Sequence, residues 1–147
     1  MFGYGCLAVI SSAIIGTAGT IAWWAGDRRL PVNILTTEIL TPEVKPGGRL
    51  TIRQKIDYVR DCPAHVDRSV YDDATHREFL PDIDYERPPT GLGTRTVTFE
   101  IDIPPFFVPG MGTYRAQPNY WCNPLQKFWW PISRPETVIP FTIMRPD

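Results

Sequence analysis

The chain has 147 residues and a formal net charge of −1, with 15 Lys and Arg against 16 Asp and Glu. Because acidic and basic residues are interspersed, no concentrated basic face is expected, and nucleic acid is excluded as a partner. The 16 prolines argue against long helices in most of the chain, because proline removes a backbone donor and fixes φ. The length that follows residue 30 corresponds to one domain.

The charged residues are distributed very unevenly. Residues 1–26 contain no Lys, Arg, Asp or Glu, so residues 27–147 carry all of them. A helix that crosses the hydrocarbon core of a bilayer needs about 20 largely apolar residues, and Leu7–Ala25 supplies 19. The pattern predicts a transmembrane α-helix over residues 1–26, followed by a short juxtamembrane linker over residues 27–31.

Four residues at the end of this segment fit a membrane interface. Trp23 and Trp24 fall where an aromatic belt is expected, and Arg28 and Arg29 follow where headgroups or water begin. A cleaved signal peptide is disfavoured, because no basic residue precedes the apolar run and no small-x-small cleavage site ends it.

A further alternative is a helix that packs in a hydrophobic assembly rather than in lipid. Ser12, Gly16 and Thr20 place small residues on one helix face, a spacing that permits close helix–helix contact. Residues 1–26 therefore predict a membrane or a hydrophobic assembly as partner, and self-association into a homo-oligomer is one form of the latter.

The rest of the chain reads as β-structure. Leu50, Ile52, Ile56 and Tyr58 share one parity while charged and polar residues take the other, which is the pattern of a half-buried strand. Similar runs, separated by Pro and Gly turns, recur about every ten residues. The strands expected from this pattern are residues 32–40, 49–61, 65–71, 94–103, 113–122 and 137–144, with a weak additional strand near 79–85.

Two of the three cysteines belong to this β-region. Cys62 and Cys122 end the second and the sixth of these strands along the chain, counting the weak one. In a Greek-key sandwich of immunoglobulin type these two strands run in the same direction in opposing sheets, which brings both cysteines to one end. Tyr120 also stands two residues before Cys122, as in a tyrosine corner. We therefore expect a Cys62–Cys122 disulfide and an all-β, immunoglobulin-like Greek-key β-sandwich over residues 32–147.

The architecture departs from immunoglobulin domains in detail, because the third strand has no Trp and the cysteines lie at strand ends. A resemblance to one group of proteins is carried by four short segments: Val44-Lys-Pro-Gly-Gly-Arg-Leu50, Asp61-Cys62 with Val66-Asp-Arg68, Tyr120-Trp-Cys-Asn-Pro-Leu125, and Trp130-Pro-Ile132. The order and spacing of these segments resemble uncharacterised small proteins encoded by phages and prophages of proteobacteria. The resemblance implies an N-terminal hydrophobic segment with one β-domain, and it supplies no activity.

The two topology signals oppose one another. Arg28 and Arg29 flank only the C-terminal side of the span, which favours a cytoplasmic body. A disulfide is expected mainly in oxidising compartments. Giving the disulfide more weight, we expect the bacterial inner membrane with the body in the periplasm, or association with a virion.

No catalytic constellation, metal site or cofactor is expected. His65 and His76 with neighbouring acidic residues (Asp67, Asp72, Asp73 and Glu78) suggest a two-histidine metal site, but surface histidines are the better interpretation. Asp82, Asp84 and Glu86 lack the spacing of a calcium loop and read as an exposed loop. Cys122 and His65 could be interpreted as a thiol–imidazole pair, but a disulfide is the simpler role for Cys122.

The strongest local anomaly is aromatic. Trp121, Phe128, Trp129 and Trp130 lie within ten residues of one another, and Phe106 and Phe107 occupy the preceding strand connection. Exposed aromatics are enriched at interfaces. These six residues are candidates for binding a protein, a glycan or a membrane interface; the alternative is a hydrophobic plug over the end of the sandwich.

These observations predict a non-enzymatic, membrane-anchored binding or assembly module, encoded by a phage and acting at the bacterial envelope or in the virion. One alternative is a lysis factor in which the span itself disrupts the envelope. Another is a structural virion component whose hydrophobic helix packs against other copies.

Overall fold

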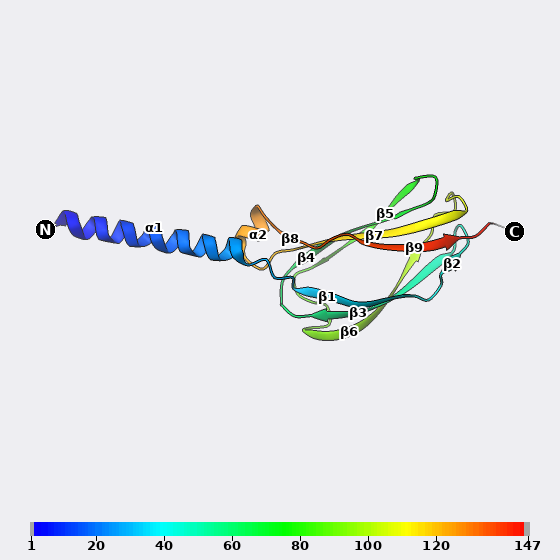
Figure 1. The fold of residues 1–147 in the computed structure, drawn as a ribbon, viewed down its shortest axis with the longest axis horizontal. Coiled ribbons are helices and arrows are strands. Elements are labelled where there is room, and N and C mark those ends of the chain that lie inside the picture. The colour runs from blue at the N-terminus through cyan, green and yellow to red at the C-terminus, as the bar shows by residue number, and fades with distance from the viewer. Residues whose placement is uncertain (1, 146–147) are drawn as a thin grey trace.

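The structure, a computed structural model, describes residues 2–145, with side chains from Tyr4 onward. Helix α1 (Phe2–Gly26) extends away from the rest of the chain as a rod (Figure 1), and its most apolar stretch buries nothing against the protein. The hydroxyls of Ser12, Thr17 and Thr20 donate to carbonyls four residues earlier, at 2.8–2.9 Å. The helix thus provides the acceptors for these three hydroxyls itself, which suits a segment without water around it.

By length and composition α1 is able to cross a membrane, and a signal sequence meets the same criterion. Its 25 residues correspond to about 37 Å at 1.5 Å per residue, against about 30 Å of hydrocarbon core. The predicted helix is confirmed as an apolar helix over residues 2–26, and Met1 lies outside the described residues.

The body (residues 32–145) is a two-layered β-structure with sheets that do not close into a barrel (Figure 1). One sheet has the order β1-β3-β6 and the other the order β2-β9-β7-β4-β5, with β8 attached to β7. All pairs are antiparallel except β2 with β9, which is parallel. The strands are β1 (Val32–Ile39), β2 (Glu43–Val44), β3 (Arg49–Tyr58), β4 (Ala64–Tyr71), β5 (Arg77–Tyr85), β6 (Gly93–Asp102), β7 (Gly110–Tyr120), β8 (Ile132–Ser133) and β9 (Thr137–Ile143).

The hydrophobic core lies between the two sheets because alternate residues of the strands point inward. In β7 every second residue from Gly112 to Tyr120 is buried, which is the period of two expected of a strand with one solvated face. The main core cluster includes Leu50, Ile52, Val70 and Ile103, each almost fully buried. A second, smaller cluster lies at the end of the body next to α1 and contains Val32, Tyr58, Ala64, Tyr120 and Ile132.

The six expected strands are confirmed, with three differences. The region near 79–85 is not weak: β5 is nine residues long and pairs with β4 throughout. Strand β3 ends at Tyr58 rather than at 61, because the chain turns out of the sheet toward the disulfide. The connection after β7 contains a short helix, α2 (Pro124–Phe128), that the sequence analysis did not predict.

The tyrosine-corner interpretation is wrong in one respect. Tyr120 is buried, as its parity predicts. A tyrosine corner requires its hydroxyl to bind backbone a few residues upstream. Among the described residues, that hydroxyl has no hydrogen-bond partner.

Candidate functional site

The end of the body that faces α1 is closed by a disulfide. Cys62 and Cys122 are bonded, with their Cα atoms 4.9 Å apart, and they join the segment after β3 to the segment after β7. The predicted disulfide is therefore confirmed. Because both sulfurs are in this bond, the thiol–imidazole pairing of Cys122 with His65 is excluded. Cys6, on α1, is a free cysteine.

A buried glutamine connects this disulfide to the end of α1. The side chain of Gln126, 1% exposed, donates from Nε2 to the Asp27 carbonyl at 2.6 Å. Its Oε1 accepts the backbone N–H of Cys122 at 2.7 Å. One side chain thus bridges the chain leaving the helix and the chain leaving the disulfide.

Asn123 makes a second connection from the same turn. Its Oδ1 caps α2 by accepting the N–H of Gln126 at 3.0 Å, and its Nδ2 donates to the Trp24 carbonyl at 3.3 Å. The last carbonyls of a helix have no partner within the helix. Here the body supplies one of those partners, so α2 acts as an external cap for α1.

Two arginines complete the attachment. Arg60 pairs with the Asp27 carboxylate through both of its terminal nitrogens, one at 3.1 Å, and also donates to the Arg29 carbonyl at 2.9 Å. The hydrogen bond from Arg60 lowers the pKa of Asp27 although partial burial opposes it. Arg28 donates to the carbonyls of Trp130 and Pro131, each at 2.8 Å. We call this set of residues the junction: Asp27, Arg28, Arg60, Asn123 and Gln126.

The predicted roles of Arg28 and Arg29 therefore differ. The Arg28 guanidinium lies 4.3 Å from the centre of the Trp130 ring and is held by the body. The Arg29 side chain is 85% exposed and lies 3.6 Å from the Asp27 carboxylate. Of the two arginines that the sequence analysis assigned to headgroups or water, Arg29 is the one whose side chain is mainly exposed to solvent.

Aromatic side chains surround the junction. Phe128 is the last residue of α2, which contacts α1 (Figure 1), and Trp129 and Trp130 follow it; each of the three is more than half exposed. Trp23, in the last turn of α1, is 76% exposed. We call these four residues the aromatic collar. Trp121 is half-buried, and its N–H donates to the Pro63 carbonyl.

The six candidate aromatics do not form one surface, which corrects their grouping. Strand β6 runs away from α1, so Phe106 and Phe107 lie at the opposite end of the body from Trp129. Phe107 is 3% exposed and belongs to the main core, so it is not a surface residue. Phe106 is exposed and packs edge-on against Phe107 and His76.

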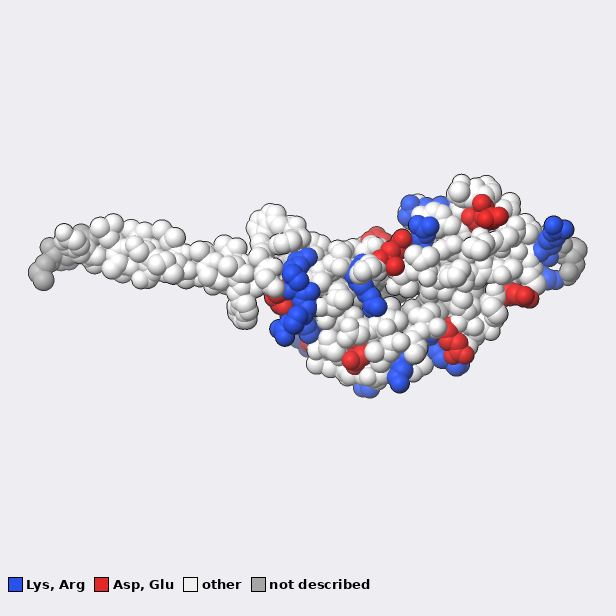
Figure 2. All heavy atoms as spheres, viewed as in Figure 1, with Lys and Arg blue, Asp and Glu red and all other residues white. Residues whose placement is uncertain are grey.

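Basic side chains are present next to the helix. Figure 2 shows a group of Lys and Arg side chains at the end of the body beside α1, other charged side chains of both signs over the rest of the body, and no charged side chain along the helix. This end of the molecule thus combines an apolar rod, exposed aromatic rings and basic groups. That combination matches the depth profile of a membrane interface, where aromatic rings meet headgroups.

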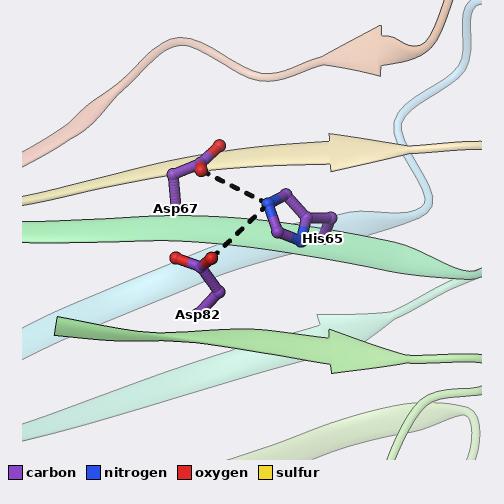
Figure 3. Close-up of side chains that lie close together, drawn as sticks. All are labelled: His65, Asp67 and Asp82. Carbon is purple, nitrogen blue, oxygen red and sulfur yellow. Dashed lines mark hydrogen bonds and ion pairs between the residues drawn. The ribbon is translucent and has the colours of Figure 1, made fainter. Parts of the chain in front are cut away.

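The histidines occupy two separate places. His65, on β4, contacts carboxylates of β4 and β5: its Nε2 lies 3.2 Å from Asp67 and 4.0 Å from Asp82 (Figure 3). Its Nδ1 lies 2.6 Å from Asp84. The hydrogen bond to Asp84 raises the pKa of His65, with a smaller contribution from Asp67 and partial burial opposing. His65, Asp67 and Asp82 offer three donor atoms within 4.8 Å, but exposed cross-strand ion pairs account for the arrangement equally well.

His76 lies instead at the other end of β4, in the turn to β5, where its Nδ1 contacts Asp72 at 2.7 Å. The two-histidine metal site considered from the sequence is therefore wrong, because the histidines do not meet. Asp82 and Asp84 lie in strand β5 rather than in the exposed loop that the sequence analysis expected.

The residues that sequence reasoning missed are Arg60, Asn123 and Gln126. A usable signal was present: Asn123-Pro124-Leu-Gln126 combines an N-cap residue, Pro at the first helical position and Gln at the third. That pattern predicts the start of a helix, whereas the sequence analysis expected only a strand over residues 113–122 and no helix after it. No signal in the sequence pairs Asn123 with Trp24 or Gln126 with Asp27, each 99 positions away, or Arg60 with Asp27, 33 positions away.

No protein-family model and no curated protein matches the chain. Among solved structures, a β-glucosidase from Erythrobacter marinus is similar at 13% identity and TM-score 0.48, over 77% of this chain and 15% of that one. The alkylpurine DNA glycosylase AlkC of Pseudomonas fluorescens, bound to DNA with an abasic site analogue, is similar at 11% identity and TM-score 0.44, over 78% of this chain and 31% of that one. Spo0M, a sporulation control protein from Bacillus subtilis, is similar at 11% identity and TM-score 0.33, over 78% of this chain and 49% of that one. The chain spans less than half of each, and at these TM-scores none of them carries an argument about this protein.

Proposed function

We propose that this protein is a non-enzymatic, membrane-anchored binding or assembly module of the bacterial envelope. Helix α1 spans the inner membrane, the junction fixes the body against the membrane surface, and the body lies on the periplasmic side. An origin in a phage or prophage remains a prediction from the resemblance of the four sequence segments.

The observation that carries this proposal is the junction. Gln126, Asn123 and Arg28 form hydrogen bonds between the body and residues 24–28, at the end of α1. Removal of a signal sequence before Asp27 would take away the Trp24 carbonyl that Asn123 binds. It would also leave Asp27 and Arg28, which Gln126, Trp130 and Pro131 contact, as a new chain end, and chain ends are poorly ordered. The junction therefore favours a permanent helix over a cleaved one.

The aromatic collar supports a specific position of the body. Helix α2, which ends at Phe128, contacts α1, and the Trp130 carbonyl accepts a hydrogen bond from Arg28, two residues beyond the end of α1. Amphipathic rings at that level suit the boundary between acyl chains and headgroups. We therefore propose that the collar contacts the membrane interface, in place of the protein or glycan that the sequence analysis also allowed.

The disulfide supports the periplasmic side. Structural disulfides persist in oxidising compartments. The opposing signal, the arginine pair, is weakened by the junction: the charge of Arg28 is held by two carbonyls and a ring, and the charge of Arg60 is paired with Asp27. Only the exposed Arg29 acts as an ordinary topology signal.

The strand order supports an immunoglobulin-like Greek-key assignment. Strands β1, β3 and β6 take the places of strands A, B and E, and β4, β7 and β9 take those of C, F and G. The disulfide then joins the ends of strands B and F. This assignment concerns architecture and carries no activity with it.

The topology is tested with a reporter cysteine on the solvated face of the body. In a Cys6→Ser background, Thr98→Cys places a thiol at an exposed position of β6. Spheroplasts are treated with a membrane-impermeant maleimide before and after lysis. Labelling before lysis is expected; labelling only after lysis would place the body in the cytoplasm and overturn the proposal. A Cys6→Ser chain without the reporter is the matched control.

Anchoring is tested on the same cells. The full-length mass of the mature chain and its retention in the membrane after alkaline carbonate extraction are expected. A chain shortened near residue 26, or a soluble full-length monomer, contradicts a permanent anchor. Quenching of tryptophan fluorescence by brominated lipids tests the collar, and Trp129→Phe is expected to reduce the quenching.

A further inference from the structure

A cavity lies between the two sheets in the half of the body nearest α1. Its volume is about 270 Å³, and both sheets contribute to its walls. Most of the lining is apolar and includes Val32, Ile34, Ile56, Val97 and Phe99. Protein interiors are normally close-packed, with few voids larger than a water molecule. A cavity of this size is close to the lower end of the range found for small-molecule sites.

Three tyrosines bring hydroxyl groups into this apolar surrounding. Tyr58, Tyr85 and Tyr120 all line the cavity, and the rings of Tyr58 and Tyr85 pack edge to face with centroids 6.5 Å apart. Tyr58 is 8% exposed and Tyr120 is 4% exposed. Within residues 2–145, none of the three hydroxyls has a hydrogen-bond partner. None of the three oxygens is among the fully buried unpaired polar atoms of the described residues, so each is open to solvent in the cavity, where a bound acceptor would take the place of water.

The tyrosines are suited to donate. Burial raises the pKa of Tyr58 and of Tyr85, and raises the pKa of Tyr120 to about 12. All three hydroxyls therefore keep their protons at neutral pH, and each has one hydrogen to give.

Positive charge lies nearby. Arg68 lines the cavity while its guanidinium donates to the Pro81 carbonyl. The charge of Arg134 acts on Tyr120, lowering the pKa that burial raises. A negatively charged acceptor is therefore favoured at the tyrosines over a neutral or positive one.

The cavity has an entrance between the sheets. Its lining includes Ile83 and Tyr85 of β5, Val97 and Phe99 of β6, and the connection at Pro89. Strands β5 and β6 end their respective sheets and lie in opposite layers (Figure 1), so no strand pairing closes this side. A ligand is able to enter here without breaking a sheet.

We propose that this cavity binds a medium-chain fatty acid, with the acyl chain between the sheets and the carboxylate accepting hydrogen bonds from the tyrosine hydroxyls. The volume has room for about nine groups of the size of a water molecule, which fits a chain of about eight to ten carbon atoms. The apolar walls match the chain, and the phenols, with the charge of Arg134 acting on Tyr120, match the carboxylate. This site is separate from the junction and stands whether or not α1 spans a membrane.

The test uses the full chain in phospholipid nanodiscs and a decanoic acid analogue that carries a diazirine at the end of its chain. After illumination, cross-linked residues are mapped by mass spectrometry. We expect cross-links within β5, β6 or β7 at cavity residues, and competition by unlabelled decanoate but not by decylamine. Cross-links confined to α1 and the collar would show mere partition into the bilayer and would overturn the proposal, as would equal competition by decylamine.

Variants distinguish specific binding in the cavity from non-specific binding of the fatty acid elsewhere on the protein. The double variant Tyr58→Phe and Tyr120→Phe keeps both rings and removes two hydroxyls, so the competing concentration of decanoate is expected to rise by on the order of tenfold. Ala116→Leu fills the cavity from β7 and is expected to abolish the cavity cross-links. Tyr71→Phe, outside the cavity lining, is the matched control and should leave them unchanged. Unaltered cross-linking in both cavity variants, with native disulfide and thermal unfolding, contradicts the proposal.

Discussion

The two ends of the body are stabilised in different ways. The end next to α1 depends on hydrogen bonds between residues 99 to 103 positions apart, which link Trp24, Asp27 and Arg28 to the segment 123–131. The far end depends on a single buried carboxylate in a tight turn. Asp72 accepts the N–H and the Nδ1 of His76, four residues away, and the N–H of Val108. The end next to α1 joins the helix to the body, whereas the far end is stabilised by contacts within the body alone.

This difference indicates which part of the protein a substitution at each end should affect. Changes at the junction are expected to loosen the helix from the body while the strands remain paired. Changes at the far end are expected to weaken the sandwich and leave the attachment intact. The predictions below test this separation, in decreasing order of effect.

The largest effect is expected from the disulfide. It closes a loop of 60 residues, and in the chain-entropy model its loss destabilises the body by about 4 kcal/mol. Replacing Cys62 and Cys122 by Ser should lower the free energy of unfolding by this amount in urea titrations. Cys6→Ser, which removes the exposed free thiol of α1, should have no effect. Equal free energies of unfolding in the double variant and the parent would contradict a stabilising role of the disulfide.

The junction glutamine comes second. Gln126→Ala leaves the Asp27 carbonyl and the Cys122 N–H without their partners, and each lost bond at a buried group costs about 1–3 kcal/mol. We expect a loss of about 2–3 kcal/mol together with faster tryptic cleavage after Arg28. Lys127→Ala, one residue along the same helix, is exposed and should change neither quantity. If unfolding shifts but cleavage does not, Gln126 supports the sandwich and not the attachment.

At the far end, Asp72→Ala should cost about 1–3 kcal/mol, because it leaves buried N–H groups unpaired. Tryptic cleavage after Arg28 should stay at the parent rate. Asp73→Ala, at the exposed neighbouring position, is the control. A rise in cleavage after Arg28 would show that the two ends are coupled.

The parent protein should also show a pH dependence that this variant lacks. Burial acts to raise the pKa of Asp72, but the hydrogen bonds from Val108 and His76 outweigh it, so the pKa is lowered below 3.8. A carboxyl with a lowered pKa stabilises the folded state above its unfolded pKa, and this contribution is lost as pH falls through the folded pKa. The difference in stability between parent and Asp72→Ala should therefore be constant near neutral pH and shrink below pH 3.8. A difference that persists in acid contradicts the role of the carboxylate.

The smallest effects are expected within the collar. Trp130→Ala removes the ring beneath the Arg28 guanidinium, an interaction worth about 0.5–1 kcal/mol. Trp129→Ala removes a ring that is 77% exposed, and its effect should stay within about 0.5 kcal/mol. Urea titration of both variants gives the comparison. A larger loss in Trp129→Ala than in Trp130→Ala would mean that the exposed ring, not the stacked one, supports the junction.

Much of the architecture was predictable because its signals are local. The apolar composition of residues 1–26 and the alternation in β3, β6 and β7 depend only on neighbours along the chain, and the structure has the helix and the strands at those places. The pairing of Cys62 with Cys122 followed from strand direction. The second helix was missed although Asn123 and Gln126 carried a capping signal for it.

The site was predictable only in part. Exposed aromatics near the disulfide were expected, and Phe128, Trp129 and Trp130 lie there. Phe106 and Phe107 were grouped with them because they precede the same strand, yet a strand carries its two ends to opposite sides of the body. Nearness in sequence was therefore a poor guide to nearness in space.

The sequence by itself determined that a charge-free helix precedes a proline-rich β-body with one candidate cysteine pair, because charge, parity and proline act residue by residue. Only the tertiary structure decided that Gln126 and Asn123 form hydrogen bonds with the chain at the end of the helix, that Arg28 forms hydrogen bonds with the body, and that three tyrosines line one cavity. The reason is physical: a buried polar group must find its partner wherever packing brings one, and that choice depends on the whole fold.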